Sequence, residues 1–158
     1  MMYLRKSFMM GLAVFAIGGG WLSRTVAQEK TASPGVTFFD HKKVDAVFAG
    51  NAPLLFEGGS GQAKYIVLTA NRQRPGEVEI HNLDTDIIYV LRGTATFVTG
   101  GTSVAAKTTA PDELRGQSIQ GGDTHHLSKG DVIVIPPGVP HWFKEVKAPF
   151  LYFVVKVH

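Results

Sequence analysis

Three residues close together in this sequence carry side chains that bind metal ions or transfer protons: Glu79, His81 and Asp86. Alternate side chains of a strand share one face, so Glu79 and His81 point the same way if residues 78–81 form a strand. Residues 82–85, Asn-Leu-Asp-Thr, have the composition of a turn. If the chain folds back there in register, Asp86 joins the other two in a cluster of two carboxylates and one imidazole. Taken singly, acidic residues at strand ends are typical of solvated positions.

A further histidine, His141, lies in the stretch GDVIVIPPGVPHWF at residues 130–143. Val132 to Ile135 are β-branched and bounded by a glycine and a proline, which predicts a strand buried on both faces. The prolines and the glycine that follow form a stiff turn, because proline fixes φ and glycine adopts conformations that other residues avoid. The turn therefore holds His141 at a fixed point. A lone histidine beside a core strand is also typical of a satisfied polar residue without further function.

The first 27 residues have the order of a secretory signal. Arg5 and Lys6 make a basic start, residues 7–23 carry no charge, and residues 25–27, Thr-Val-Ala, end the segment with a small-x-small pattern. We expect cleavage after Ala27 and a periplasmic or secreted protein. The alternative is an uncleaved anchor, which is disfavoured because the uncharged stretch is shorter than the 18 or more residues of a spanning helix. No stable membrane insertion is expected after cleavage.

Removal of residues 1–27 from the 158-residue chain leaves 131 residues, the size of one domain. It also removes three of the 16 basic residues and none of the 13 acidic ones, so the mature chain has no formal net charge. A neutral chain gives no reason to expect a nucleic-acid partner. The absence of cysteine excludes disulfides, thiolate metal sites and cysteine nucleophiles.

The mature chain reads as a short polar leader at residues 28–37, one helix and then many short strands. Asp40 is the expected N-cap of the helix. The strands are separated by glycine and proline turns, which indicates an all-β fold, an antiparallel sandwich or barrel. Residues 105–122 are polar and without a clear period, which favours a surface loop over a lid. His126, with its neighbour His125, is expected to be an exposed strand-end residue.

The stretch around His141 resembles the second sequence motif of the cupin superfamily. The pattern Gly130-x5-Pro136-x-Gly138-x2-His141 matches that motif at each position up to its histidine.

The stretch around His81 resembles the first cupin motif, G-x5-H-x-H-x(3,4)-E-x6-G, in spacing and in part of its residues. Glu79 stands at the first histidine, His81 is the second, Asp86 replaces the glutamate and Gly93 closes the motif, while Gln73 stands where the leading glycine belongs.

The resemblance implies an antiparallel jelly-roll β-barrel over residues 38–158, with one short N-terminal helix and with the two motifs meeting inside the barrel mouth. It also implies a homodimer, because cupins often pair through sheet edges or outer faces. The metal ligands that it implies are Glu79, His81, Asp86 and His141, a donor set suited to a divalent ion such as Mn, Fe, Zn or Ni. The alternative is a cupin that has lost its metal and binds a ligand in a bare pocket.

By the same resemblance, the expected function is that of an exported cupin that holds a divalent metal and acts on or binds a small oxygen-rich molecule. Dioxygenase, isomerase and lyase chemistry all fit, because cupins use one barrel for many reactions. A non-catalytic module that binds a small molecule or a metal is the competing hypothesis. The residues assign no catalytic side chain and no organic cofactor.

Overall fold

The computed structural model describes residues 35–50, 52–61 and 63–158. The predicted signal peptide, residues 1–27, and most of the leader, residues 28–37, lie outside this range. Residues 38–158 form one compact unit, and residues 35–37 belong to a separate one. In the described ranges, no helix has the length and apolar character needed to cross a membrane.

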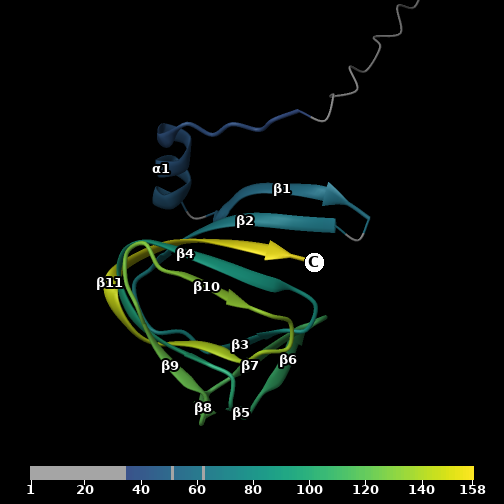
Figure 1. The fold of residues 1–158 in the computed structure, drawn as a ribbon, viewed down its shortest axis with the longest axis vertical. Helices are drawn as coiled ribbons and strands as arrows, with labels where there is room; N and C mark the ends of the chain where they lie inside the picture. Colours follow the sequence, from purple (N-terminus) through teal and green to yellow (C-terminus); the bar gives the residue numbers. More distant parts are fainter. Residues whose placement is uncertain (1–34, 51, 62) are drawn as a thin grey trace, which may run out of the picture. The chain divides into compact units, whose positions relative to one another are not determined.

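The compact unit consists of one helix followed by strands, as the sequence predicts (Figure 1). Helix α1 spans His41–Ala49, and the Asp40 carboxylate caps it by accepting a hydrogen bond of 2.8 Å from the Lys43 amide. The strands are β1 (Leu54–Ser60), β2 (Ala63–Arg72), β3 (Val78–His81), β4 (Thr85–Thr99), β5 (Thr102–Val104), β6 (Lys107–Ala110), β7 (Glu113–Gly116), β8 (Ser118–Gln120), β9 (Asp123–Leu127), β10 (Val132–Ile135) and β11 (His141–Val157).

All strand pairs are antiparallel. The main sheet runs in the order β1-β2-β11-β3-β7-β6, and β4 joins it by pairing with β11, β10 and β9. Figure 1 shows β11 curving around one side of the barrel, from β3 to β2. The all-β antiparallel fold with one short N-terminal helix is therefore confirmed.

The two long strands, β4 and β11, bend together at Gly93. On one side of the bend, residues 94–99 of β4 pair with residues 141–147 of β11, and on the other side residues 85–92 pair with residues 151–157. Gly93 has a φ of +88°, and a Cβ there would lie 2.5 Å from the Pro149 carbonyl oxygen. Only glycine allows this combination of conformation and close backbone contact.

The barrel interior is filled by aromatic and β-branched side chains. Phe97, Val90 and Phe150 have no exposed surface, and Phe143 is nearly buried. The Phe143 ring centroid lies 4.5 Å from that of Phe97 and 5.2 Å from that of Tyr152. The polar residues of the stretch that resembles the first cupin motif line a cavity together with Phe143 and Tyr152.

The strand at Val132–Ile135 is present, but the prediction that both of its faces are buried is wrong. Val132 and Val134 are 60% and 56% exposed, whereas Ile135 is buried. The strand pairs with β4 and presents these two valines on the outside of the barrel. β-Branched residues favour a strand whether their side chains are buried or exposed. The run of four therefore predicted a strand without showing which side chains face the barrel interior.

The segment at residues 105–122 is not a loop, and this prediction is also wrong. It contains β6, β7 and β8, and β7 pairs with β3 inside the main sheet. Every residue of β6 is exposed. An outer strand is held by backbone hydrogen bonds and needs no apolar pattern, so its polar composition concealed it.

The predicted hairpin, in which the chain folds back on residues 78–81 after a turn at residues 82–85, does not form. The strand β3 pairs with β11 and β7, whereas β4 pairs with β10, β11 and β9. Residues 82–85 are thus a connection between different parts of the barrel. Asp86 still comes close to His81, but across the barrel interior and not across a hairpin.

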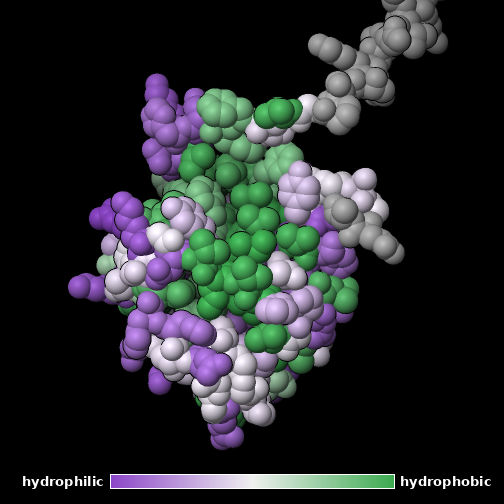
Figure 2. All heavy atoms as spheres, viewed as in Figure 1, coloured by the Kyte–Doolittle hydropathy of each residue, from purple (hydrophilic) through white to green (hydrophobic). Residues whose placement is uncertain are grey.

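The outer surface of β4 and β10 is apolar. Figure 2 shows hydrophobic residues gathered in the middle of the view, over the region where these strands lie. Val132 and its register partner Tyr89 are both exposed there, with Val134 beside them. Apolar patches of this kind mark contact surfaces. The homodimer remains a prediction, and this patch is a surface on which a second copy could pack.

Gly93→Ala should destabilise the barrel more than Gly130→Ala. The two glycines have similar φ values, +88° and +95°, so alanine costs about 1–2 kcal/mol of backbone strain at either position. Nothing lies within 4 Å of a Cβ at Gly130, whereas the Cβ at Gly93 clashes with backbone atoms. We expect a further loss of about 1–3 kcal/mol for Gly93→Ala in urea denaturation. Equal losses would contradict the tight contact at the bend.

Candidate metal centre

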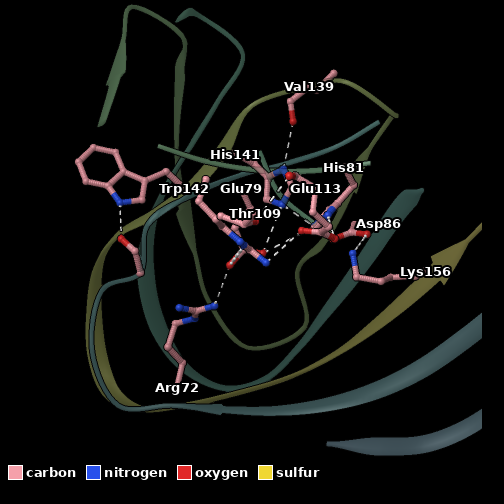
Figure 3. A network of polar contacts seen from close by, with 12 residues as sticks. Arg72, Glu79, His81, Asp86, Thr109, Glu113, Val139, His141, Trp142 and Lys156 are labelled. Atoms are coloured by element: carbon pink, nitrogen blue, oxygen red, sulfur yellow. Dashed lines mark hydrogen bonds and ion pairs between the residues drawn. The ribbon is translucent and has the colours of Figure 1, made fainter. Parts of the chain in front are cut away.

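Four polar residues of the two motifs meet on the inner wall of the barrel (Figure 3). Glu79 and His81 come from β3, and His141 is the first residue of β11, in direct register with Glu79. Asp86 comes from β4, where it pairs with Lys156 at the other end of β11. His81, Asp86 and His141 are all buried. The structure therefore brings together the four residues that the sequence singles out.

The proline turn before β11 fixes His141 and also ties it to His81. The Gly138 amide donates a hydrogen bond of 2.8 Å to the His81 carbonyl, and Gly138 has the positive φ that favours glycine. The His141 Nδ1 donates to the Val139 carbonyl at 3.1 Å, since a carbonyl only accepts. The neutral His141 ring thus keeps its lone pair on Nε2, the nitrogen that faces the cluster.

Ligand atoms of Glu79, His81 and His141 all lie within 4.8 Å of one another. Glu79 Oε2 is 3.7 Å from His81 Nε2 and 3.9 Å from His141 Nε2. Two imidazoles and a carboxylate can hold Fe(II), Mn(II) or Zn(II) and leave positions open for other ligands. A cavity of about 250 Å³ adjoins these three residues, and Phe143 forms part of its wall.

Asp86 lies in the cluster but is shared with a cation. Its Oδ2 atom is 3.4 Å from His81 Nε2 and 3.8 Å from His141 Nε2. Its Oδ1 atom accepts a hydrogen bond of 2.7 Å from Lys156 Nζ. One oxygen of Asp86 therefore faces the imidazoles, while the other is held by Lys156.

Sequence reasoning missed two residues of the site, Glu113 and Arg115. They lie on β7, within the segment predicted as a loop, and they are the direct cross-strand partners of His81 and Glu79 respectively. Arg115 Nη1 is 2.9 Å from Glu79 Oε1, and Arg115 Nη2 is 3.1 Å from Glu113 Oε2. The available signal was their spacing of two, which places both side chains on one face of a strand.

The surroundings of His81 fit a metal ligand. Among the described residues, neither of its buried ring nitrogens has an aligned hydrogen-bond partner. Glu113 Oε1 lies 2.5 Å from Nδ1, but outside the direction of a ring N–H. Buried polar atoms without partners are rare in folded proteins, and a bound ion is one explanation for them. A carboxylate on the far side of the ring is also the usual partner that orients a ligating imidazole.

The family model described as "Cupin" matches residues 40–158. The chain belongs to the cupin family.

Solved structures of low sequence identity are similar to this cupin. A cupin protein from Bacteroides fragilis is 14% identical with a TM-score of 0.38, covering 62% of this chain and 67% of its own. A cupin 2 conserved barrel domain protein from Rhodopseudomonas palustris is 18% identical with a TM-score of 0.42, covering 68% and 64%. The DMSP lyase DddQ from Ruegeria pomeroyi is 19% identical with a TM-score of 0.40, covering 63% and 40%. No curated protein matches this cupin.

The carboxylates of the cupin centre hold a proton on His81. Burial opposes charge on His81, but Asp86 and Glu79 outweigh it and raise its pKa to about 9. Burial also opposes the charge on Glu79, but His81 and Arg115 outweigh it and lower that pKa to about 2. Burial lowers the pKa of His141. The metal-free centre at neutral pH therefore contains one imidazolium and one neutral imidazole, and an ion must displace the His81 proton to bind there.

In metal-free protein, the stabilising contribution of His81 should disappear as the pH rises. The pKa of His81 is about 9 in the folded state and 6.5 for the free side chain. The contribution is therefore fully present below pH 6.5 and is lost as the pH rises through 9. With chelator present, the difference in Tm between the unmodified protein and His81→Gln should be larger at pH 6 than at about pH 9.5.

The exposed His126 supplies the control for this measurement. His126→Gln should change Tm little at either pH. A His81→Gln difference that stays the same across the range would contradict the raised pKa.

Proposed function

We propose that this cupin binds one divalent metal ion through Glu79, His81 and His141, and that it acts at this ion on a small oxygen-rich molecule. Mn, Fe, Zn and Ni are the candidate ions. The observation that supports the proposal is the convergence of three ligand atoms within 4.8 Å, from two motifs far apart in the sequence, beside a cavity. The ion would supply Lewis acidity or a site for dioxygen.

In this proposal, Glu79, His81 and His141 bind the ion, and Asp86 has a different role. The three ligands lie together on β3 and at the start of β11, so the rest of the coordination sphere is left for a small molecule in the cavity. Asp86 is a fourth oxygen donor or a partner for a hydroxyl group of that molecule. Contacts with His81 and Lys156 lower its pKa in spite of burial, so Asp86 stays charged and can accept a hydrogen bond, but it is a weak base.

A non-catalytic function is the second candidate, because the carboxylates of the centre already have cationic partners. Arg115 pairs with Glu79, and Lys156 pairs with Asp86. Such pairs compensate buried charge without an ion. A cupin of this kind would bind a small molecule in the bare cavity or store a metal. Metal content separates metal-free ligand binding from the metal-dependent functions.

His81→Ala and His141→Ala should each abolish stoichiometric metal binding. The protein is purified without chelators and without a nickel column, and its metal content is measured by inductively coupled plasma mass spectrometry. We expect about one ion per chain in the unmodified protein and almost none in either variant, because each variant removes one of three ligands. Circular dichroism should show a folded barrel, since the apolar core consists of residues other than the ligands.

His126→Ala is the matched control and should keep its metal, because His126 is exposed and lies outside the cavity. A His141→Ala protein that retains one ion per chain would show that the site is misassigned.

We also propose that the protein is exported and that the mature chain begins at Gln28. The support is the order of basic start, uncharged stretch and small residues in the first 27 positions. Mass spectrometry of the intact protein from its native host should give the mass of residues 28–158. A mass that includes Met1 would refute cleavage.

A further inference from the structure

We infer that the open cleft beside the metal centre binds the carboxylate group of a small organic acid through Arg72 and Arg115. The inference deepens the proposed function and rests on it, because it assigns a chemical class to the molecule that reaches the metal.

The cleft is an extension of the metal centre. It has a volume of about 860 Å³, and residues 70–77 form much of its wall. Four residues line both the cleft and the inner cavity: Ala70, Glu79, Arg115 and Tyr152. A molecule bound in the cleft therefore lies next to the ligand Glu79.

The cleft is rich in arginine. Its lining includes Arg72, Arg74 and Arg115, with Glu77 and Glu79 as the acidic residues. When Glu79 ligates a cation, its negative charge is used there. Three guanidinium groups then remain with two carboxylates, Glu77 in the cleft lining and Glu113, which pairs with Arg115. The excess of positive charge attracts an anion.

Glu79 separates the arginines from the imidazoles. Its Oε2 atom faces His81 and His141, whereas its Oε1 atom lies 2.9 Å from Arg115 Nη1 and 3.8 Å from Arg72 Nη2. An anion bound to Arg72 and Arg115 would be separated from the metal ion only by the Glu79 carboxylate. A two-oxygen ligand with a charged end can thus contact the arginines and the ion together.

The Arg72 guanidinium is held rigidly by its neighbours. It lies over the Phe143 ring, 4.4 Å from the centroid, and its Nε and Nη2 donate to the Tyr152 hydroxyl at 3.4 and 3.2 Å. A Cβ at Gly76 would lie 2.6 Å from Arg72 Nη1, so the glycine makes room for the group. Figure 3 shows Arg72 pointing toward Glu79 and the cluster. A guanidinium fixed in this way loses little freedom when it binds a carboxylate, whose geometry matches its planar fork.

The test is glycolate binding to the Zn²⁺-loaded protein, measured by isothermal titration calorimetry with zinc content determined in parallel. Arg72→Gln should raise the Kd for glycolate about tenfold or more, because it removes a charged donor. Zinc should stay at one ion per chain. Arg72→Lys keeps the charge without the fork, so its Kd should lie between those of the unmodified protein and Arg72→Gln.

Arg92→Gln is the matched control, because Arg92 lies on β4 outside the cleft. It should change the Kd for glycolate by less than about twofold. Ethylene glycol has the same two-carbon, two-oxygen frame without the charge. It should bind more weakly than glycolate, and Arg72→Gln should leave its Kd unchanged.

The inference is overturned if Arg72→Gln holds one zinc ion and binds glycolate as tightly as the unmodified protein, since the ion alone would then hold the acid. Failure of the proposed function is seen separately, as an unmodified protein that binds no zinc. The same titrations are then made on the metal-free protein. There, a Kd that Arg72→Gln raises supports the anion site, and no binding or an unchanged Kd refutes it.

Discussion

The arrangement of this centre depends on the two oxygens of Glu79 facing different groups. One oxygen faces two imidazoles and the other contacts Arg115. The carboxylate remains charged because these neighbours outweigh the cost of burial. With a neutral residue at position 79, less negative charge would compensate the positive charges of Arg115, Arg72 and the protonated His81. The balance of charge on both sides of β3 therefore depends on this one residue.

The barrel fixes the position of this carboxylate through pairing on both sides of a short strand. β3 has β11 on one side, where Glu79 meets His141, and β7 on the other, where it meets Arg115. β11 reaches β3 because it bends with β4 at Gly93, where the backbones approach too closely for a side chain. The aromatic core fills the space behind His141, with the Phe97 ring centroid 6.0 Å from that of the imidazole. Fold and site are thus determined by the same strand pairs.

Local features of the sequence predicted the parts of this structure that local physics controls. The Asp40 cap, the strand at 132–135 and the turn that delivers His141 each follow from residues close together in the chain. The partners of β3 did not follow, because strand pairing is decided by distant segments, and proximity in sequence suggested a hairpin that does not exist. The four motif residues were nevertheless found, since their spacing in the cupin pattern carries information about the whole barrel.

The residues that were missed belong to strands without an apolar pattern. Glu113 and Arg115 lie on β7, whose neighbour β6 is fully exposed, so neither strand shows the alternation that marks a half-buried sheet. Lys156 lies on β11, but a lysine in a strand is typical of an exposed position. Its pairing with Asp86 depends on the far end of β11 and could not be seen from either residue alone.

The hydrogen bond from the Gly138 amide to the His81 carbonyl also has a consequence for the order of folding. It joins β3 to the turn that precedes the last strand, so the two histidines reach their relative positions only when distant parts of the chain have come together. A chain emerging during synthesis carries His81 long before His141. Until β11 pairs with β3, Glu79 and His81 are not yet beside His141, so the proposed metal site is complete only at the final stage of assembly.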